Sequence, residues 1–374
     1  MTMNTARRHA KSPSLRFSSS ISSSSIDLLD TMESPDALKD EILCEGDEAE
    51  GRMNGGGQSS LVFLGTGCSS AVPSARCLIQ PTDPPCPVCT ESLSIPPEEN
   101  PNYKCNTSLL IDYCQDDGAH SYIQIDVGKT FREQVLRWFT GHKIPRIDSI
   151  VLTHEHADAV LGLDDIRMFP RFSPTNDIDP IPIYCTQYTV DSIAKRFPYL
   201  VKRRLEEGQI VRFIAQLDWN IIDGDPEKPF VISGLEFVPL PIIITILGKC
   251  PFLFIYYLQI FFFMQVMHGE DYISDVSRFP AATEYLISES GAGQLDLLII
   301  DTNSLRKVVS RSTHFSFPET LDALKRIRPK RALLIGMTHD YDHHTHNKIL
   351  EEWSIREGIP VQLARDGLRV FIDL

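Results

Sequence analysis

The feature that most constrains this chain is a group of metal-binding side chains just past a short apolar run, Ile150-Val151-Leu152. His154, His156 and Asp158 follow at alternate positions, so an extended backbone directs all three side chains to the same side. Neutral imidazole and carboxylate suit zinc, iron or manganese, and a site with few protein ligands leaves a position for water. The alternative is a surface loop that happens to hold two histidines. The apolar lead-in and Gly162 instead favour a strand-loop-helix turn.

The segment Thr153-His154-Glu155-His156-Ala157-Asp158 resembles the His-x-His-x-Asp signature of the metallo-β-lactamase superfamily. That signature usually ends in a further histidine, where this chain has Ala159. The resemblance runs from about Leu61 to Leu374. It is greatest to the branch of the cyclic phosphodiesterase of bacterial phosphonate breakdown, and more remote to the endonuclease that trims transfer-RNA 3′ ends. It implies an α/β protein with an αββα sandwich and a metal-dependent hydrolase activity.

The periodicity of the chain indicates the same fold class. Strands are expected at residues 60–65, 107–113, 121–127, 182–185, 209–213, 295–300, 332–336, 361–364 and 368–372. Helices are expected at residues 131–140, 188–206 and 318–328. Alternating strands and helices, with strand pairs near the start, fit a mixed α/β sandwich over residues 59–374.

Residues 1–58 have a different composition and are expected to be a disordered tail. Residues 1–26 contain nine serines and four Lys or Arg, and no acid. Such a start resembles an organelle transit peptide, and a phosphorylatable tail is the equal alternative. The acidic residues 27–51 and the glycines at 55–57 indicate a linker. The expected location is a chloroplast or mitochondrion if the start is a transit peptide, and otherwise the cytoplasm.

The charge and the cysteines exclude some classes of protein. A net charge of −14 argues against a general nucleic-acid binder, which would present a basic face. The basic runs at residues 202–204 and 325–331 are expected to be solvated helix faces. The nine cysteines, an odd number in a long chain, indicate reduced thiols or metal ligands and not a disulfide framework.

Three of those cysteines predict a metal site. Cys86 and Cys89 are separated by two residues in a proline-rich loop, and Cys77 precedes them. Such a pair brings two thiolates within reach of one metal ion, and Cys77 can supply a third. The prolines disfavour a redox role, which needs a helix start beside a thioredoxin-like strand. The resemblance implies a structural zinc held by the early cysteines and a late histidine, for which we assign His343, with His344 as the alternative.

The resemblance also implies the active-site residues. A first divalent ion would be held by His154, His156 and His268, a second by Asp158 and His339, and Asp275 would bridge them. Ala159 leaves the second site one ligand short, which Asp165 or water could complete. His314 follows a strand end, as does the general acid of the related phosphodiesterase. An imidazolium near its unperturbed pKa of about 6.5 can deliver a proton at neutral pH.

Two divalent ions, zinc or manganese, would activate water and neutralise charge on a phosphoryl group. A small phosphodiester is therefore the expected substrate, with Asp158 and His314 in the catalytic roles. An RNA-processing nuclease of the same superfamily and a catalytically impaired metal-binding protein are the alternatives. Neither nucleic acid nor a membrane is an expected partner.

Residues 242–265 interrupt the expected pattern. The family places an apolar-His-Gly loop almost directly after Pro239-Leu240-Pro241, whereas here an apolar insert intervenes. It could be a membrane span, a buried or interface segment, or translated non-coding sequence. Its densest part, residues 252–264, is shorter than the roughly 20 residues of a transmembrane helix. Six residues then separate His268 from Asp275, too few for the family's strand pair, so a misplaced ligand is expected.

Overall fold

The structure is a computed structural model that describes residues 57–169, 171–172, 178–201, 215–244, 258–263, 269–291, 293–306 and 313–374. The described residues belong to one compact unit, Asn54–Leu374. The predictions for the N-terminal tail, the strand at 209–213, the basic run at 202–204 and His268 lie outside the described residues.

A seven-stranded mixed sheet has the order β17-β1-β2-β3-β4-β7-β8. Its strands are β1 (Ser59–Gly65), β2 (Ser108–Cys114), β3 (His120–Ile125), β4 (Ser149–Val151), β7 (Ile181–Cys185), β8 (Leu217–Ile221) and β17 (Arg369–Ile372). Pairing is antiparallel from β17 to β3 and parallel from β3 to β8. The last strand of the chain therefore completes the sheet that the first strand begins.

A second, parallel sheet has the order β13-β14-β15-β16. Its strands are β13 (Glu270–Ile273), β14 (Leu297–Asp301), β15 (Ala332–Ile335) and β16 (Val361–Leu363). Three two-stranded pairs accompany the sheets: β5 (Arg171–Phe172) with β6 (Ile178–Asp179), β9 (Phe230–Ile232) with β10 (Leu235–Phe237), and β11 (Pro239–Ile244) with β12 (Leu258–Phe263). In the parallel sheet all carboxyl ends share one edge and all amino ends the other.

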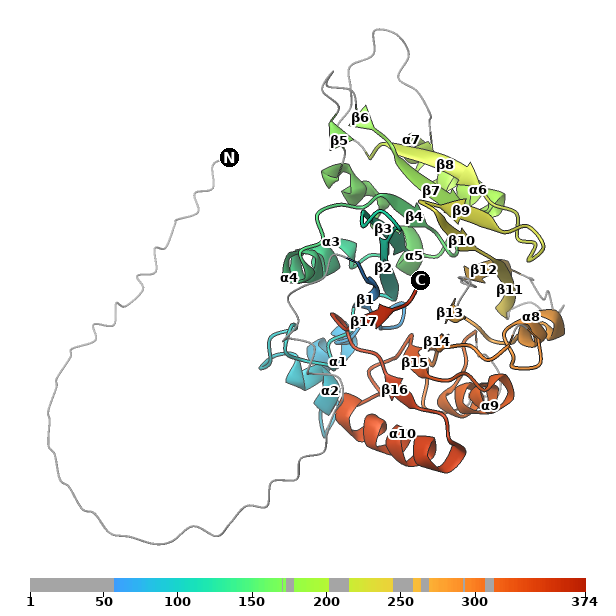
Figure 1. The fold of residues 1–374 in the computed structure, drawn as a ribbon. Helices are drawn as coiled ribbons and strands as arrows, with labels where there is room; N and C mark the ends of the chain where they lie inside the picture. The colour runs from blue at the N-terminus through green and yellow to red at the C-terminus, as the bar shows by residue number, and fades with distance from the viewer. Residues whose placement is uncertain are drawn as a thin grey trace, which may run out of the picture. The chain divides into compact units, whose positions relative to one another are not determined.

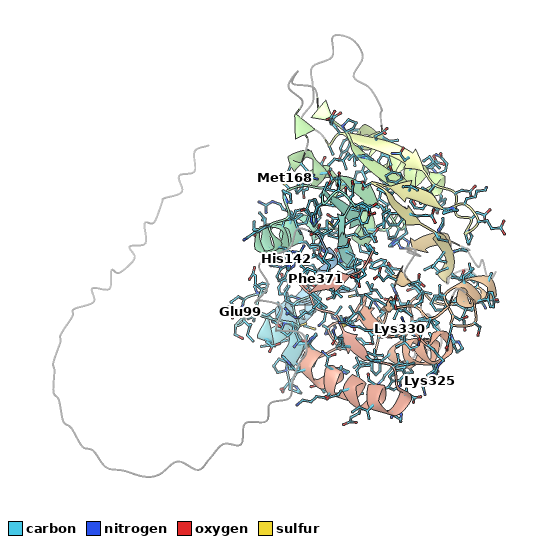
Figure 2. The ribbon with its side chains drawn as sticks, in the orientation of Figure 1. Glu99, His142, Met168, Lys325, Lys330 and Phe371 are labelled. Carbon is cyan, nitrogen blue, oxygen red and sulfur yellow. The ribbon has the colours of Figure 1, made fainter. Side chains whose placement is uncertain are left out.

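The alternation of side chains along β1 explains the layering. Phe63 packs between the sheets with Ile299 of β14, whereas its neighbour Leu64 points to the opposite face. On that outer face Leu64 joins a second core with Ile193, while Leu324 packs on the outer side of the parallel sheet. The layers are thus helix, sheet, sheet and helix, and side chains fill the space between the ribbons (Figures 1 and 2). The predicted αββα sandwich is confirmed.

The helices fall into two groups in chain order, those that precede β8 and those that follow β13. The first group is α1 (Ala75–Ile79), α2 (Pro87–Glu91), α3 (Phe131–Gln134), the π-helix η2 (Val135–Phe139), α4 (Thr140–His142), α5 (Ala157–Val160), the 3₁₀ helix η3 (Leu163–Met168), α6 (Gln187–Arg196) and α7 (Pro198–Val201). The second is α8 (Ala281–Leu286), α9 (Phe317–Ile327) and α10 (His343–Glu357). A capping box of Ser316 and Glu319 starts α9, and Asp342 caps α10 by accepting from the Thr345 N–H.

The start of the apolar insert is part of the core, which agrees with a buried or interface segment among the three alternatives. Ile242 and Ile243 of β11 are 2% and 8% exposed. The Ser277 hydroxyl donates to the Ile243 carbonyl over 2.7 Å, and β12 pairs with β11 along its whole length. Among the described residues, no helix has the length and apolar character needed to cross a membrane.

Candidate active site and zinc site

The histidine loop follows β4, a strand with three buried residues. His154 is 2% exposed, His156 is half exposed, and Asp158 lies in the first turn of α5. One ligand atom from each of the three lies within 4.8 Å of the others. The three side chains therefore group as a cluster that could hold a metal ion, although Asp158 lies in a helical turn and not on the extended backbone that the alternate spacing assumed.

Neighbouring groups set the form of His154 that a metal needs. The Thr153 hydroxyl donates to Asp126 over 2.6 Å and lies 2.8 Å from His154 Nδ1, from which it can accept. This relay fixes the proton on Nδ1 and leaves the Nε2 lone pair for a ligand. Burial also lowers the pKa of His154, which favours the neutral ring. Nε2 is buried without a hydrogen-bond partner, as expected of an atom that binds a metal.

Asp275 reaches the same place from the parallel sheet. It lies two residues beyond β13, and its Oδ2 is 3.4 Å from His154 Nε2. The short connection from His268 to Asp275 was expected to misplace a ligand; Asp275 does reach the histidine, whereas His268 lies outside the described residues. The backbone achieves this with a positive φ of 51° at Asp275, a conformation that L-residues rarely adopt.

His314 lies on the other side of Asp275. Its Nδ1 is 3.1 Å from Asp275 Oδ1 and 3.0 Å from Asp301 Oδ2. Asp301 ends β14 and is 1% exposed. Burial acts to lower the pKa of His314, but the Asp301 and Asp275 carboxylates outweigh it and raise the pKa to about 10. His314 is therefore an imidazolium at neutral pH in the protein without metal.

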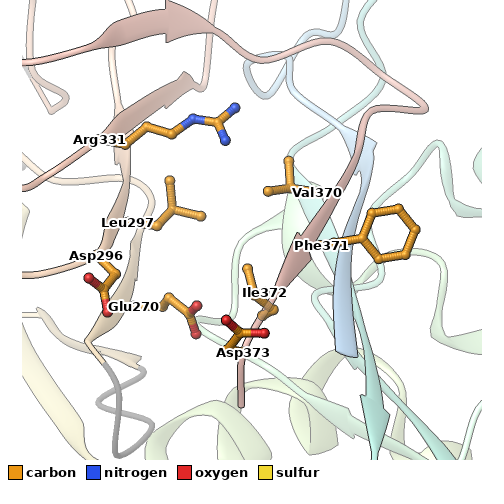
Figure 3. Close-up of a pocket in the computed structure, with 8 residues that line it drawn as sticks. All are labelled: Glu270, Asp296, Leu297, Arg331, Val370, Phe371, Ile372 and Asp373. Atoms are coloured by element: carbon orange, nitrogen blue, oxygen red, sulfur yellow. The ribbon is translucent and has the colours of Figure 1, made fainter. Parts of the chain in front are cut away.

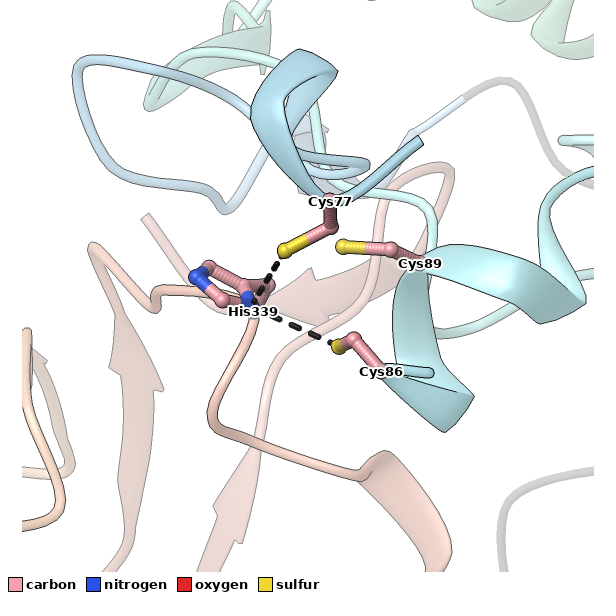
Figure 4. Close-up of side chains that lie close together, drawn as sticks. All are labelled: Cys77, Cys86, Cys89 and His339. Atoms are coloured by element: carbon pink, nitrogen blue, oxygen red, sulfur yellow. Dashed lines mark hydrogen bonds between the residues drawn. The ribbon is translucent and has the colours of Figure 1, made fainter. Parts of the chain in front are cut away.

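The three predicted cysteines form a second cluster together with His339, which comes from the loop after β15 (Figure 4). Cys77 comes from α1, Cys86 and Cys89 from α2 and its N-cap, and His339 from the loop after β15. His339 Nδ1 is 3.7 Å from Cys77 Sγ and 3.5 Å from Cys86 Sγ. The Ser74 N–H donates to Cys89 Sγ over 3.2 Å, a contact that suits a thiolate. Three sulfurs and one imidazole match a structural zinc site.

This cluster corrects the two predicted histidine assignments. His339, assigned to the second active-site ion, lies with the cysteines. His343, assigned to the cysteines, begins α10 and is not in the cluster; its Nε2 lies 3.0 Å from Asn347 Nδ2. Burial lowers the pKa of His343 to about 4, so its ring is neutral. Of the two histidines, His339 is nearer in sequence to the end of β15, and it is the one that lies with the cysteines.

Two further expectations concern the second ion. Ala159 is 1% exposed and packs in the core of the first sheet, so it offers no ligand. Asp165 is not among the described residues that group with His154. Sequence reasoning did not assign roles to Thr153 and Asp301, although Asp301 could have been noticed as an acid that ends a buried strand.

The chain belongs to the metallo-β-lactamase superfamily of hydrolases. A family described as the β-lactamase superfamily domain matches residues 121–337, more than half of the chain. The fold and the His-x-His-x-Asp cluster agree with this assignment. Members of the superfamily typically bind divalent metal ions, and a Zn²⁺-bound structure occurs among the similar folds.

Solved structures agree in fold. A diphosphatase from the PhnP family has a TM-score of 0.62 and 25% identity, covering 85% of this chain and 98% of that one. Zn²⁺-bound PqqB from Methylobacterium extorquens has a TM-score of 0.60 and 15% identity, over 84% of this chain and all (100%) of that one. Yeast PDE1, unliganded, has a TM-score of 0.51 and 11% identity, over 84% and 99%. The two at lower identity show the fold alone.

A curated relative is an octanoyltransferase from Porphyromonas gingivalis (strain ATCC BAA-308 / W83). It is 28% identical over 317 residues, which make up 83% of this chain and 51% of that protein. The chain thus spans about half the length of this relative. The name of the relative describes the whole of that protein, so octanoyl transfer is not carried over to this chain.

Proposed function

We propose that this protein is a metal-dependent phosphodiesterase that uses a water molecule as nucleophile. The observation that carries the proposal is the position of Asp275, between His154 Nε2, the nitrogen available to a metal, and the ring of His314. The metal ligands and a proton donor thus lie next to each other, and metal-assisted hydrolysis of a phosphodiester uses both.

The ligand set is proposed to hold two divalent ions, zinc or manganese. His154, His156 and His268 would hold the first ion and Asp158 the second, with Asp275 as a ligand to both. Bound there, the ions would supply charge neutralisation for the phosphoryl group and activate water. Asp126 and Thr153 hold the His154 ring in the required orientation and tautomer. Asp158 Oδ1 lies 3.9 Å from His154 Nε2, and its side chain is 14% exposed.

His314 is proposed as the general acid for the leaving oxygen. Asp301 and Asp275 both accept from its Nδ1 side, so the proton to be delivered is the one on Nε2. Asp301 fixes the ring because its own carboxylate is buried at the end of β14. General acids of this kind contribute roughly 10²–10⁴-fold to the rate.

Two observations favour a small phosphorylated substrate over RNA. The PhnP-family neighbour is named as a diphosphatase, so its substrate also carries phosphoryl groups. Most cations of the basic run at 325–331 are paired with acids: Lys325 with Glu357, Arg326 with Glu284, and Lys330 with Asp296. Lys325 and Lys330, labelled in Figure 2, are both exposed. Charges neutralised in this way give little attraction for a phosphate backbone.

The test is turnover of bis(p-nitrophenyl) phosphate by protein stripped of metal with a chelator and then reloaded with zinc or manganese. Activity should follow the metal content of the histidine cluster, and His154→Ala should abolish activity and remove most of the metal held there, while the cysteine cluster retains its own metal. His120→Ala is the matched control, because His120 pairs with Asp112 on β2 and leaves the metal cluster intact.

Full turnover by the stripped protein, or by His154→Ala, would refute the proposal. Metal binding without turnover of any phosphodiester would favour the catalytically impaired alternative. Cleavage of transfer-RNA precursors in preference to small diesters, with a steep dependence on salt, would favour the nuclease.

A further inference from the structure

A pocket lies at the amino ends of the parallel strands, the opposite edge of the sheet from the catalytic groups (Figure 3). Glu270 is the first residue of β13, and Arg331 immediately precedes β15. Asp301, by contrast, is the last residue of β14. A strand of this length separates its two ends by roughly 15 Å. The pocket of about 380 Å³ is within the usual range for small-molecule sites and is distinct from the metal cluster.

One end of the pocket is acidic and contains an unsatisfied group. Glu270 is 5% exposed, and its Oε2 is buried without a hydrogen-bond partner. Asp373, beyond the end of β17, adds a second carboxylate. Asp296 also lines this end, but Lys330 pairs with it over 2.5 Å. A buried carboxylate oxygen without a partner is costly, so a cationic hydrogen-bond donor would be favoured there.

The other end of the pocket is cationic. Arg331 lines it, and no carboxylate in the described part of the chain forms an ion pair with this guanidinium. Figure 3 shows Arg331 and the pair Glu270 and Asp373 at opposite ends, with Leu297 between them. A planar guanidinium is suited to bind a carboxylate through two parallel hydrogen bonds.

The wall between the two ends is apolar. Leu297, Val370 and Ile372 contribute aliphatic surface, and each is less than a tenth exposed. The carboxylates of the pocket are not among the described groups of three or more ligands close enough to hold one metal ion. The ligand is therefore better described as an organic molecule with separated charges than as a metal ion.

We propose that this pocket binds a small zwitterion, with a primary ammonium group on Glu270 and Asp373, a carboxylate on Arg331, and an alkyl body against the apolar wall. The ammonium supplies the donor that Glu270 Oε2 lacks, and the carboxylate neutralises Arg331. The site is independent of the proposed hydrolase activity, because none of its residues contacts the catalytic cluster.

The test is calorimetric titration of the full, metal-loaded chain with ε-aminocaproate, compared with hexylamine and hexanoate. Saturable binding of one ε-aminocaproate is expected, at least tenfold tighter than either single-charged compound, because both ends contribute. Glu270→Gln should weaken ε-aminocaproate and hexylamine at least tenfold without affecting hexanoate. Arg331→Gln should weaken ε-aminocaproate and hexanoate to a similar extent without affecting hexylamine.

Glu289→Gln, an exposed acid that pairs with Arg328, is the control and should bind as the unmodified chain does. Asp373→Asn, at the exposed end of the pocket, repeats the hexylamine test if Glu270→Gln lowers the melting temperature. Absence of saturable ε-aminocaproate binding, or equal effects of both variants on both single-charged compounds, would overturn the proposal.

Discussion

Asp275 combines an unusual backbone with a central position among charged groups. A positive φ is uncommon at residues other than glycine, although Asp adopts it more readily than most, and here it brings the carboxylate to 3.4 Å from His154 and 3.1 Å from His314. A glycine would adopt the conformation at lower cost but could not supply the carboxylate. Strain retained at a carboxylate between two imidazoles is consistent with a functional constraint.

The role of His314 predicts a dependence on the leaving group. His314→Ala should slow diesters with poor leaving groups by roughly 10²–10⁴-fold, because the leaving oxygen then departs without a proton. Diesters of p-nitrophenol, whose leaving group needs no proton, should be slowed much less. Rates with both substrate types and the metal content of the variant test this.

Asp301→Asn is the companion variant, because it keeps the size of the side chain but removes the charge beside His314 Nδ1. It should show the same leaving-group pattern with a smaller loss. Equal slowing of good and poor leaving groups in His314→Ala would instead indicate a structural role for the ring.

The zinc site proposed at Cys77, Cys86, Cys89 and His339 predicts which histidine matters for stability. Cys86→Ser and His339→Ala should each release about one zinc per chain and lower the melting temperature, since structural zinc contributes folding energy. His343→Ala, whose ring is outside the cluster, should retain that zinc. Metal analysis and thermal melting distinguish the three, and loss of zinc in His343→Ala alone would restore the original assignment.

At the scale of elements, two glycines let the loop after β3 pack against α5. A Cβ on Gly128 would lie 1.9 Å from the Asp158 carbonyl oxygen, and one on Gly162 would lie 2.4 Å from the Gly128 carbonyl oxygen. Neither backbone atom can move without shifting the turn that carries the metal-binding side chains. Close packing here fixes the position of Asp158.

Gly128→Ala should therefore weaken metal binding and lower the free energy of unfolding by about 1–3 kcal/mol or more, as overpacking does. Gly141→Ala is the matched control. A Cβ on Gly141, in α4, meets nothing within 4 Å, so the change should be neutral or slightly stabilising. Metal titration and chemical denaturation measure both effects, and an unchanged metal affinity in Gly128→Ala would contradict the packing argument.

The strand pair β11–β12 predicts how the apolar insert responds to shortening. Deleting residues 242–265 removes the buried Ile242 and Ile243 and should destabilise the domain by a few kcal/mol, at about 1.5–3 kcal/mol per buried side chain. Because Ile244 pairs with Leu258, an Asn-Gly turn replacing residues 245–257 can join the two strands directly. This shorter chain should fold and melt as the full chain does. A well-folded 242–265 deletion would show that β11 is dispensable.

The differences between expectation and structure have identifiable physical causes. Local periodicity predicted most strands, because strands such as β1 and β14 consist of continuous, buried apolar runs. The spacing of His154 and Asp158 in the sequence was enough to predict that they lie close together. The exchange of His339 and His343 could not be predicted locally, since both follow β15 and only the tertiary position of α1 and α2 decides between them. The helix α10 was not predicted, because its polar start, with three histidines, lacks an apolar period. The burial of Ile242 depends on partners from distant segments.

At the scale of the whole molecule, Asp366 ties the two ends of the domain together. Its Oδ1 accepts from the backbone N–H and the hydroxyl of Thr66, 300 residues earlier, each over 2.8 Å. Its Oδ2 accepts from the Cys105 N–H over 2.7 Å. The carboxyl group thus joins the loop after β1, the approach to β2 and the approach to β17, three segments that must meet for the first sheet to close.

This junction predicts how stability depends on pH. Burial raises the pKa of Asp366 to about 7, although its hydrogen bonds and Lys104 oppose the shift. Between the unfolded pKa near 3.9 and the folded value, the folded state binds more protons than the unfolded state. The free energy of unfolding should therefore fall as pH rises through this window, by about 4 kcal/mol, and level off above it. Burial lowers the pKa of Lys104 to about 8. This shift has the opposite effect on stability, so the free energy of unfolding should rise again at more alkaline pH.

The test is to measure the free energy of unfolding of the unmodified chain and of Asp366→Asn across this pH range. The difference between the two curves cancels the contributions of all groups that the two proteins share. The Asp366→Asn curve should lack the decline between acidic and neutral pH, and parallel curves would show that Asp366 is ionised throughout in the folded protein.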